Sequence, residues 1–263
     1  MGAIEILVST MRGGPAALKK NLSVLPDNVS IRIVNQMPVD SNKLDGSSLD
    51  GRPLDVLNMS EAGLSVSRNA ALDMARADIS LVADDDLEYV ADNLLAIPSI
   101  YEKFSDADLV VFQQALPGGG LRKKYRRKAY RMGFLDVLSV SSVEISFRPD
   151  SIRRAGVKFD STFGLGAKYP ACEEAIFLSD CLKAGLRIYY FPMPIVIHDV
   201  ESSGTVFDGP AFFARGAAFR RMYGFGAYVL GPVFCFRQRK KLRKKMSFAA
   251  ILRHFFNGYQ SYE

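Results

Sequence analysis

Along the first half of the chain, the spacing of the apolar residues changes from one short segment to the next. Segments of strand length alternate with segments whose apolar residues have helical spacing. The strand-like segments are 4–9, 30–34, 54–58 and 79–83, and the helical ones are 15–25 and 64–75. This alternation is typical of βαβ units. We therefore expect an α/β fold with a Rossmann-like, mostly parallel sheet flanked by helices.

The pattern continues less regularly in the second half. We expect helices over 94–104, 149–155 and 173–184, a buried strand over 109–112, a half-buried strand over 140–147, and a long surface loop over 36–53. Gly185 stands where a left-handed C-terminal cap belongs. Beyond Gly204 the composition shifts to Phe, Tyr, Gly and Arg, so we place a boundary near residue 210. Two domains are expected, 1–210 and a basic, aromatic-rich helical extension over 211–263.

Size and composition fit a globular protein with a sizeable core. The chain has 263 residues, of which 48% are hydrophobic, and its longest apolar stretch, 222–236, is broken by three glycines and a proline. A spanning helix needs roughly 18 uninterrupted apolar residues, so no transmembrane helix is expected. The three cysteines are odd in number and lack metal-site spacing. With no basic leader before the first strand, these features favour the cytoplasm.

Positive charge is concentrated in two runs. Residues 122–131 hold seven Lys or Arg, and residues 237–245 hold seven more, with no acid in either run. The remainder is acidic, so the runs indicate docking on an anionic membrane or nucleic acid, although a solvated helix face or loop is the plainer alternative. Pro117 and three glycines precede the first run, which is expected to be a flexible arm that could serve as a lid.

Three consecutive carboxylates follow one apolar strand. Asp84, Asp85 and Asp86 come directly after residues 79–83. Acidic oxygens are preferred ligands of Mg²⁺ and Mn²⁺, and ligands of open α/β sheets bind at the carboxyl ends of strands. An Asp-rich turn that caps the next segment is the structural alternative. Arg68, near a helix start, could hold a diphosphate or a carboxylate bidentately.

Candidate functional residues also lie at the ends of two other predicted elements. Glu173 and Glu174 open a predicted helix, where the helix dipole favours acids even without a catalytic role. A paired acidic site can also raise the pKa of one carboxyl and prepare it as a general base. His198 follows the apolar residues 195–197; it is either a buried structural histidine or a metal ligand that works with a distant Asp.

The order of these motifs resembles that of the family 2 glycosyltransferases of GT-A fold. The resemblance covers roughly residues 1–205 and rests on Ser9-Thr10, Asn35-Gln36, Gly63 with Ser67-Arg68-Asn69-Ala70, Asp84-Asp85-Asp86, Cys172 to Leu178, and His198. It implies a Mn²⁺ or Mg²⁺ site at Asp86 and His198. It also implies that Thr10, Asn35, Arg68, Asp84 and Asp85 contact the nucleotide sugar, with Asp84 on the ribose side. Glu174 would be the base, and Glu173 would orient it or the acceptor.

Three positions depart from the family pattern. Asn35 replaces the Asp that commonly reads uracil, Thr10 is followed by Met11-Arg12, and Glu174 replaces the usual Asp. An amide oxygen can still accept a hydrogen bond from a base N–H.

The resemblance implies an inverting glycosyltransferase of polysaccharide or glycoconjugate biosynthesis. It would move a sugar from a nucleoside diphosphate donor, expected to be a UDP-sugar, to a hydroxyl of a saccharide acceptor, for which a lipid-linked saccharide is one candidate. The extension suits an anionic membrane surface, so we expect a peripheral location on the cytoplasmic face and no nucleic acid partner. Two alternatives stay open: a non-catalytic nucleic-acid-binding protein that uses both basic runs, and another metal-dependent nucleotide enzyme such as a nucleotidyltransferase or phosphatase.

Overall fold

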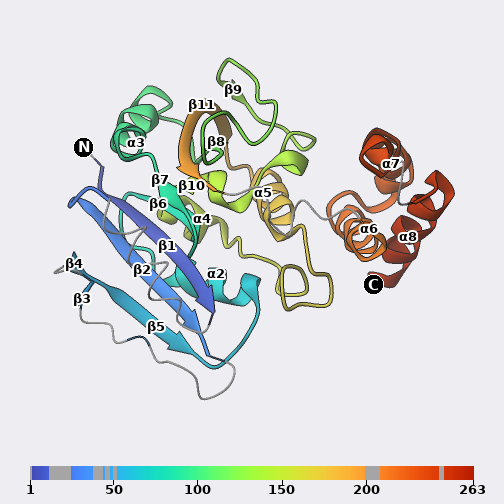
Figure 1. The fold of residues 1–263 in the computed structure, drawn as a ribbon, viewed down its shortest axis with the longest axis horizontal. Coiled ribbons are helices and arrows are strands. Elements are labelled where there is room, and N and C mark those ends of the chain that lie inside the picture. The colour runs from blue at the N-terminus through green and yellow to red at the C-terminus, as the bar shows by residue number, and fades with distance from the viewer. Residues whose placement is uncertain are drawn as a thin grey trace.

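A central sheet flanked by helices and a C-terminal bundle of helices make up the computed structural model (Figure 1). It describes residues 2–11, 25–37, 44, 48–49, 52–198, 208–242 and 246–263. The sheet has nine strands, eight of them in the order β5-β2-β1-β6-β10-β8-β11-β7, with β9 beside β11. The bounds are β1 (Ile4–Met11), β2 (Val29–Gln36), β5 (Asp55–Met59), β6 (Ile79–Asp84), β7 (Glu88–Tyr89), β8 (Leu109–Ala115), β9 (Tyr130–Arg131), β10 (Ile145–Phe147) and β11 (Ile188–Ile197).

Four of the eight strand pairings in this sheet are parallel. Strands β5, β2, β1 and β6 run in one direction, and β8 and β11 are parallel to each other. The short strand β10 lies between these groups and is antiparallel to both of its neighbours. The carboxyl ends of β1, β2 and β6 therefore meet at one edge of the sheet, where ligands of open α/β sheets bind.

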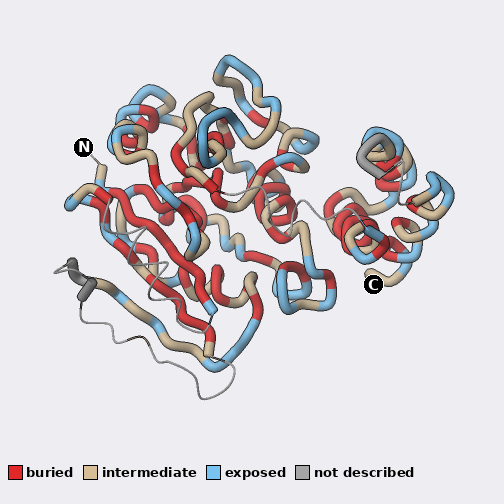
Figure 2. Tube along the Cα trace, viewed as in Figure 1, coloured by how far each residue is buried: buried red, intermediate tan, exposed pale blue. Residues whose placement is uncertain are grey.

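Helices cover both faces of the sheet, whose central strands are buried (Figure 2). Along β1, Ile6 packs with α3 (Ala91–Lys103), whereas the next residue, Leu7, packs with α2 (Leu64–Met74) on the opposite face. Helices α4 (Pro149–Ala155) and α5 (Glu173–Lys183) share the α2 face. This period-2 alternation within an almost wholly buried strand is what a sheet covered on both faces requires.

Most predicted elements are present, and Gly185 has the left-handed conformation expected of a helix cap, with φ 83°. The predicted strand over 140–147 is wrong in its first half. Residues Ser142–Glu144 form a 3₁₀ turn, η2, and only Ile145–Phe147 pair as a strand. The turn forms because the Glu144 carboxylate accepts a hydrogen bond from the Ser141 backbone N–H at 3.1 Å.

The first basic run does not form a free arm. Lys123 lies 2.8 Å from the buried Glu144 carboxylate, Arg122 donates to Gln114 at 2.7 Å, and Tyr130 and Arg131 pair with β11. These partners replace the predicted flexibility with packing against the sheet.

Two other predictions fall largely on residues outside the described ranges. The helix expected over 15–25 does so except at Leu25. Within the loop expected over 36–53, β2 extends to Gln36, and β3 (Ser48–Leu49) pairs with β4 (Arg52–Pro53).

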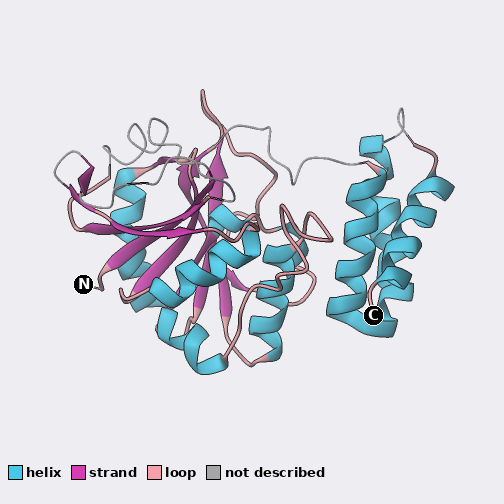
Figure 3. Cartoon of the chain, turned by 90° about the horizontal axis from the view of Figure 1, so that it is seen from below, coloured by secondary structure: helices cyan, strands magenta, loops and turns pink. Residues whose placement is uncertain are grey.

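Three C-terminal helices form a bundle at one end of the molecule (Figure 3). They are α6 (Gly209–Tyr223), α7 (Ala227–Leu242) and α8 (Phe248–Ser261), with a short 3₁₀ turn, η4 (Gly224–Gly226), between the first two. Helices α6 and α8 approach so closely that a Cβ at Gly216 would stand 1.8 Å from the Phe255 carbonyl oxygen. Glycine is therefore required at this contact.

The bundle shares a core with the α/β part of the chain. Phe163, Tyr169 and Ile176 pack in one apolar cluster with residues of α6 and α8. Arg221 on α6 also makes ion pairs with Asp180 at 2.7 Å and with Asp160 at 3.1 Å. Within the described ranges, none of the helices has the length and apolar character needed to span a bilayer.

Candidate functional site

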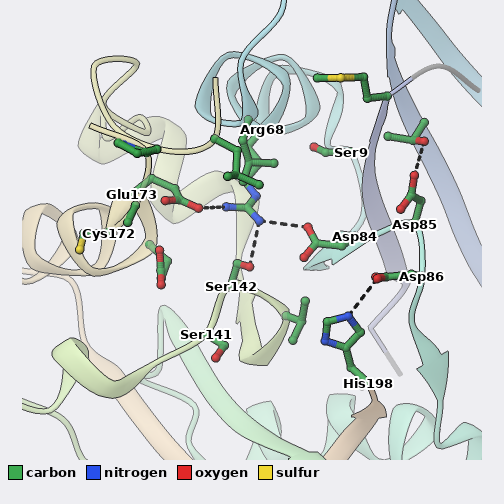
Figure 4. Close-up of a pocket in the computed structure, with 18 of the residues that line it drawn as sticks. Ser9, Arg68, Asp84, Asp85, Asp86, Ser141, Ser142, Cys172, Glu173 and His198 are labelled. Carbon is green, nitrogen blue, oxygen red and sulfur yellow. Dashed lines mark hydrogen bonds and ion pairs between the residues drawn. The ribbon is translucent and has the colours of Figure 1, made fainter. Parts of the chain in front are cut away.

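A cavity of about 450 Å³ opens at the carboxyl edge of the sheet (Figure 4). Its walls come from the ends of β1, β6 and β11, from the starts of α2 and α5, and from the residues around η2. The lining includes Thr10, Arg68, Asp84, Asp85, Asp86, Glu173, Glu174 and His198. Eight of the nine candidate residues from the sequence therefore meet in one place.

The three consecutive aspartates have three different partners. Asp84 accepts a hydrogen bond from Arg68 at 3.0 Å, Asp85 accepts one from the Thr10 hydroxyl, and Asp86 faces His198 Nε2 at 3.0 Å. Burial raises the pKa of Asp85, and the negative charges of its neighbours add to this shift. The hydrogen bond to His198 lowers the pKa of Asp86, and the same bond raises the pKa of His198.

Arg68 is the buried cation at the centre of the site. Its side chain is 3% exposed, and it donates to Glu173 at 2.7 Å, to Asp84 at 3.0 Å and to Ser142 at 2.9 Å (Figure 4). Burial by itself lowers the pKa of Arg68, but the carboxylates, Asp84 first, outweigh it and raise the pKa. The guanidinium thus joins β6, α5 and η2, and both of its Nη atoms are already engaged by protein groups.

The start of α2 is held in place by Gln36, at the end of β2. The Gln36 carboxamide accepts a hydrogen bond from the Gly63 backbone N–H at 2.7 Å and donates one to Ser67 at 3.1 Å. Gly63 has φ 136°, a conformation that disfavours residues with a side chain. This anchor fixes where Arg68, one turn further along α2, can reach.

The two glutamates at the start of α5 have different surroundings. Glu173 is buried and ion-paired with Arg68. Glu174, half-buried in the cavity wall, makes no ion pair with any residue of the described ranges; burial, together with the charge of Glu173, raises its pKa to about 8. Arg215 on α6 opposes this shift in part. A carboxyl with such a pKa can accept a proton from a substrate hydroxyl once it is ionised.

Asp86 and His198 are the residues that could hold a divalent metal. Within the described part of the chain, no three acidic, histidine or cysteine side chains converge as a complete metal site. The Asp86 oxygen and the His198 ring nitrogen, 3.0 Å apart at the cavity wall, nevertheless fit a metal that takes its other ligands from water and phosphate. Such incomplete protein shells are usual for Mg²⁺ sites that act on phosphates.

Asn35 is the candidate that the structure does not bring to the cavity. It pairs in register with Thr10 on β1, but its side chain is buried and its amide donates to Asn58 at 2.8 Å.

The sequence analysis gave no role in the site to several residues that belong to it. Ser9, Arg122, Ser141 and Ser142 line the cavity, and Arg215 affects Glu174 from the bundle. Ser9 and Gln36 flank recognised positions at strand ends, which is a usable signal. The contribution of Arg215 depends on helix packing and has no local signal.

Comparison with known proteins identifies the fold. No family model matches the chain, and no curated protein matches its sequence. Among solved structures, S. aureus TarS in complex with UDP-GlcNAc is 13% identical with a TM-score of 0.60, and the match covers 99% of this chain and 73% of that one. A longer S. aureus TarS structure is 14% identical with a TM-score of 0.60; this chain is 99% covered but spans 44% of that one.

A third match comes from a different organism. The mannosyltransferase PcManGT from Pyrobaculum calidifontis, in complex with GDP-Man and Mn²⁺, is 14% identical with a TM-score of 0.53, and the match covers 99% of this chain and 70% of that one. These similarities confirm the GT-A fold predicted from the sequence.

Proposed function

We propose that this chain is an inverting glycosyltransferase that uses a nucleoside diphosphate sugar. The observation that carries the proposal is the meeting of the aspartate triplet, His198 and the Glu173–Glu174 pair in one cavity at the carboxyl edge of the sheet. The structural neighbours support it, because their structures hold UDP, UDP-GlcNAc or GDP-Man.

The donor would lie along the ends of β1 and β6. Asp84 would accept hydrogen bonds from the ribose hydroxyls, and Thr10 with Asp85 would bound the same subsite. Asn35, at the end of β2, would contact the base only if its amide turned away from Asn58. We propose UDP as the nucleotide.

Mn²⁺ or Mg²⁺ bound at Asp86 and His198 would supply positive charge to the diphosphate as it leaves. Arg68 would add to the positive potential of the cavity from a fixed position, because its ion pairs hold it between Asp84 and Glu173. In this geometry Arg68 acts mainly by positioning the two carboxylates.

Glu174 would act as the general base. Its carboxylate takes the proton of an acceptor hydroxyl while that oxygen forms a bond to the anomeric carbon. The bond from the anomeric carbon to the diphosphate oxygen breaks, and the departing nucleoside diphosphate keeps the electron pair. A single displacement of this kind inverts the configuration at the anomeric carbon. Glu173, held by Arg68, would orient Glu174 or the acceptor.

The finer features of the predicted function also belong to this proposal. Residues 1–210 would form the catalytic domain and 211–263 an extension that meets the acceptor or a membrane. A lipid-linked saccharide acceptor would suit an enzyme bound peripherally at the cytoplasmic face. The three cysteines, all unpaired, agree with a reducing compartment.

Calorimetric titration of UDP, with and without Mn²⁺, tests the donor site. We expect Mn²⁺-dependent binding that is lost in Asp86→Ala and kept in Asp73→Ala, a 63%-exposed aspartate on α2 outside the cavity. Slow release of free sugar from a UDP-sugar would further support a transferase. Failure of UDP, GDP and dTDP to bind with either metal would refute the proposal and favour a different class of nucleotide enzyme or a nucleic-acid binder.

A further inference from the structure

The bundle leaves a row of large apolar side chains in contact with solvent. Phe225 in the turn before α7 is 79% exposed, and on α7 Tyr228, Val229, Val233 and Phe236 are between 51% and 71% exposed. Residues 225, 229, 233 and 236 follow each other at intervals of three or four, so they share one side of the helical path. A helix whose outer side is apolar normally has a partner on that side.

A second segment, distant in sequence, adds apolar side chains near the start of this row. Phe134 and Leu135, which follow β9, are 44% and 62% exposed. The Tyr223 hydroxyl at the end of α6 donates to the Phe134 carbonyl oxygen at 2.7 Å, which ties this loop to the turn that carries Phe225. In Figure 1 the loop around β9 and helix α7 lie toward the same, upper edge of the molecule.

Positive charge accompanies the apolar row. Residues 209–262 contain eleven Lys or Arg and no Asp or Glu. The Arg239 guanidinium carbon lies 3.3 Å from the centroid of the Phe236 ring, and that of Arg220 lies 5.3 Å from the Phe225 ring. Beside the second segment, Arg127 and Lys128 of the first basic run are exposed, and Arg126 pairs with Asp136.

An exposed apolar row flanked by positive charge favours one kind of binding partner over the others. A second copy of the chain docked through the same row would bring an equally positive surface against it, which is repulsive. A nucleic acid would match the charge but would gain little from the aliphatic side chains of Val229 and Val233, since its binding relies on phosphate contacts and base stacking. An anionic bilayer satisfies both features, because its headgroups attract Lys and Arg while its acyl boundary accepts apolar side chains.

We propose that α7, the preceding turn and the loop after β9 form one face that docks on a bilayer of anionic lipids. Phe225, Val229 and Val233 enter the headgroup boundary, while Arg237 and Arg239 on the last turns of α7 contact lipid phosphates. This proposal deepens the membrane contact that the proposed function gives to residues 211–263, and because the face uses no residue of the cavity, it can be tested separately from the nucleotide site.

Flotation of the full chain with vesicles tests the proposal. The vesicles are phosphatidylcholine alone or phosphatidylcholine with about one third phosphatidylglycerol, each at low and high salt. We expect flotation only with the anionic vesicles and weaker flotation at high salt. The triple variant Phe225→Ser, Val229→Ser, Val233→Ser should lose flotation. The control Leu95→Ser, which removes a 45%-exposed leucine on α3, should float like the wild type.

A second variant tests the contribution of the positive charge to vesicle binding. Arg237→Gln with Arg239→Gln should weaken anionic-vesicle binding roughly 30-fold, as expected when two surface cations are removed. Lys158→Gln with Arg187→Gln, two exposed cations elsewhere, should leave it unchanged. Circular dichroism melts establish that each variant is folded.

Four results would overturn the proposal. The first two are that the wild type does not float with anionic vesicles, or that the serine variant floats as well as the wild type. The other two are that an RNA or DNA oligonucleotide displaces the protein from the vesicles, or that sedimentation shows a dimer which the serine variant no longer forms. UDP titration on the same samples reports the cavity separately.

Discussion

Replacing Glu174 by Gln is expected to stabilise the protein in alkaline solution while it removes catalysis. In the folded chain, burial and the neighbouring Glu173 raise the pKa of Glu174 from the usual 4.5 to about 8. In the unfolded chain the carboxyl ionises normally. Between these two pKa values the unfolded state has released a proton that the folded state still holds. Stability therefore falls as pH rises through this window and levels off above pH 8.

The size of the effect follows from the same shift. Each tenfold change in proton affinity is worth about 1.4 kcal/mol, so the shift sets a ceiling of about 5 kcal/mol. Because Glu174 is only half-buried, solvent screening reduces this to about 2–3 kcal/mol. Glutamine keeps the shape and does not titrate. We expect Glu174→Gln to melt about 4–12 °C above the wild type at pH 9 and within a degree or two of it at pH 4.

Kinetics on the same variant test its chemical role. Loss of a general base should lower kcat roughly 10²- to 10⁴-fold, with little change in donor affinity. For the wild type, activity should rise with pH toward about 8 as Glu174 ionises. Glu102→Gln, on the exposed side of α3, serves as the matched control and should change neither melting nor rate. Equal melting temperatures of Glu174→Gln and wild type at both pH values, or an unchanged kcat, would refute the reasoning.

Two further predictions concern the framework of the site. Arg68→Met removes the only cation that is ion-paired with Glu173 in the described part of the chain and leaves that carboxylate and Asp84 uncompensated, so urea unfolding should show a loss of about 3–5 kcal/mol; a loss below about 1 kcal/mol would show that water replaces the guanidinium. Gly216→Ala places a methyl 1.8 Å from a carbonyl oxygen of α8 and should cost at least about 1–3 kcal/mol in the same assay. Gly226→Ala should be nearly neutral, because its new methyl would meet the Tyr223 Cβ at an ordinary contact distance of 3.8 Å. Equal effects of the two glycine variants would contradict the close packing of α6 on α8.

Sequence reasoning reached most of the site because its signals are local. Asp84 follows an apolar strand, Glu173 opens a helix and His198 ends the last strand, so each position is readable from its own neighbourhood. The carboxyl ends of parallel strands share one edge, which explains why such positions meet in space. Strand and helix types followed from periodicity for the same reason.

What the sequence did not reveal depends on long-range contacts. A turn forms at Ser142–Glu144 in place of a strand because the Glu144 carboxylate accepts a hydrogen bond from the Ser141 backbone N–H. The same carboxylate also accepts hydrogen bonds from Lys123 and Tyr125 of the first basic run. That run is consequently packed rather than free. A polar and apolar alternation cannot distinguish a strand from a turn whose polar groups find such partners.

Arg68 and Arg215 both contribute to the electrostatic surroundings of Glu174. Arg68 makes a direct ion pair with Glu173 at 2.7 Å. Burial and the charge of Glu173 raise the pKa of Glu174, and the positive charges of Arg68 and Arg215 oppose this shift in part. Since Arg215 comes from α6, the C-terminal bundle takes part in the electrostatics of the cavity. Changes in how the bundle packs should therefore alter the pKa of Glu174 as well as stability, which a pH–rate profile of Gly216→Ala would reveal.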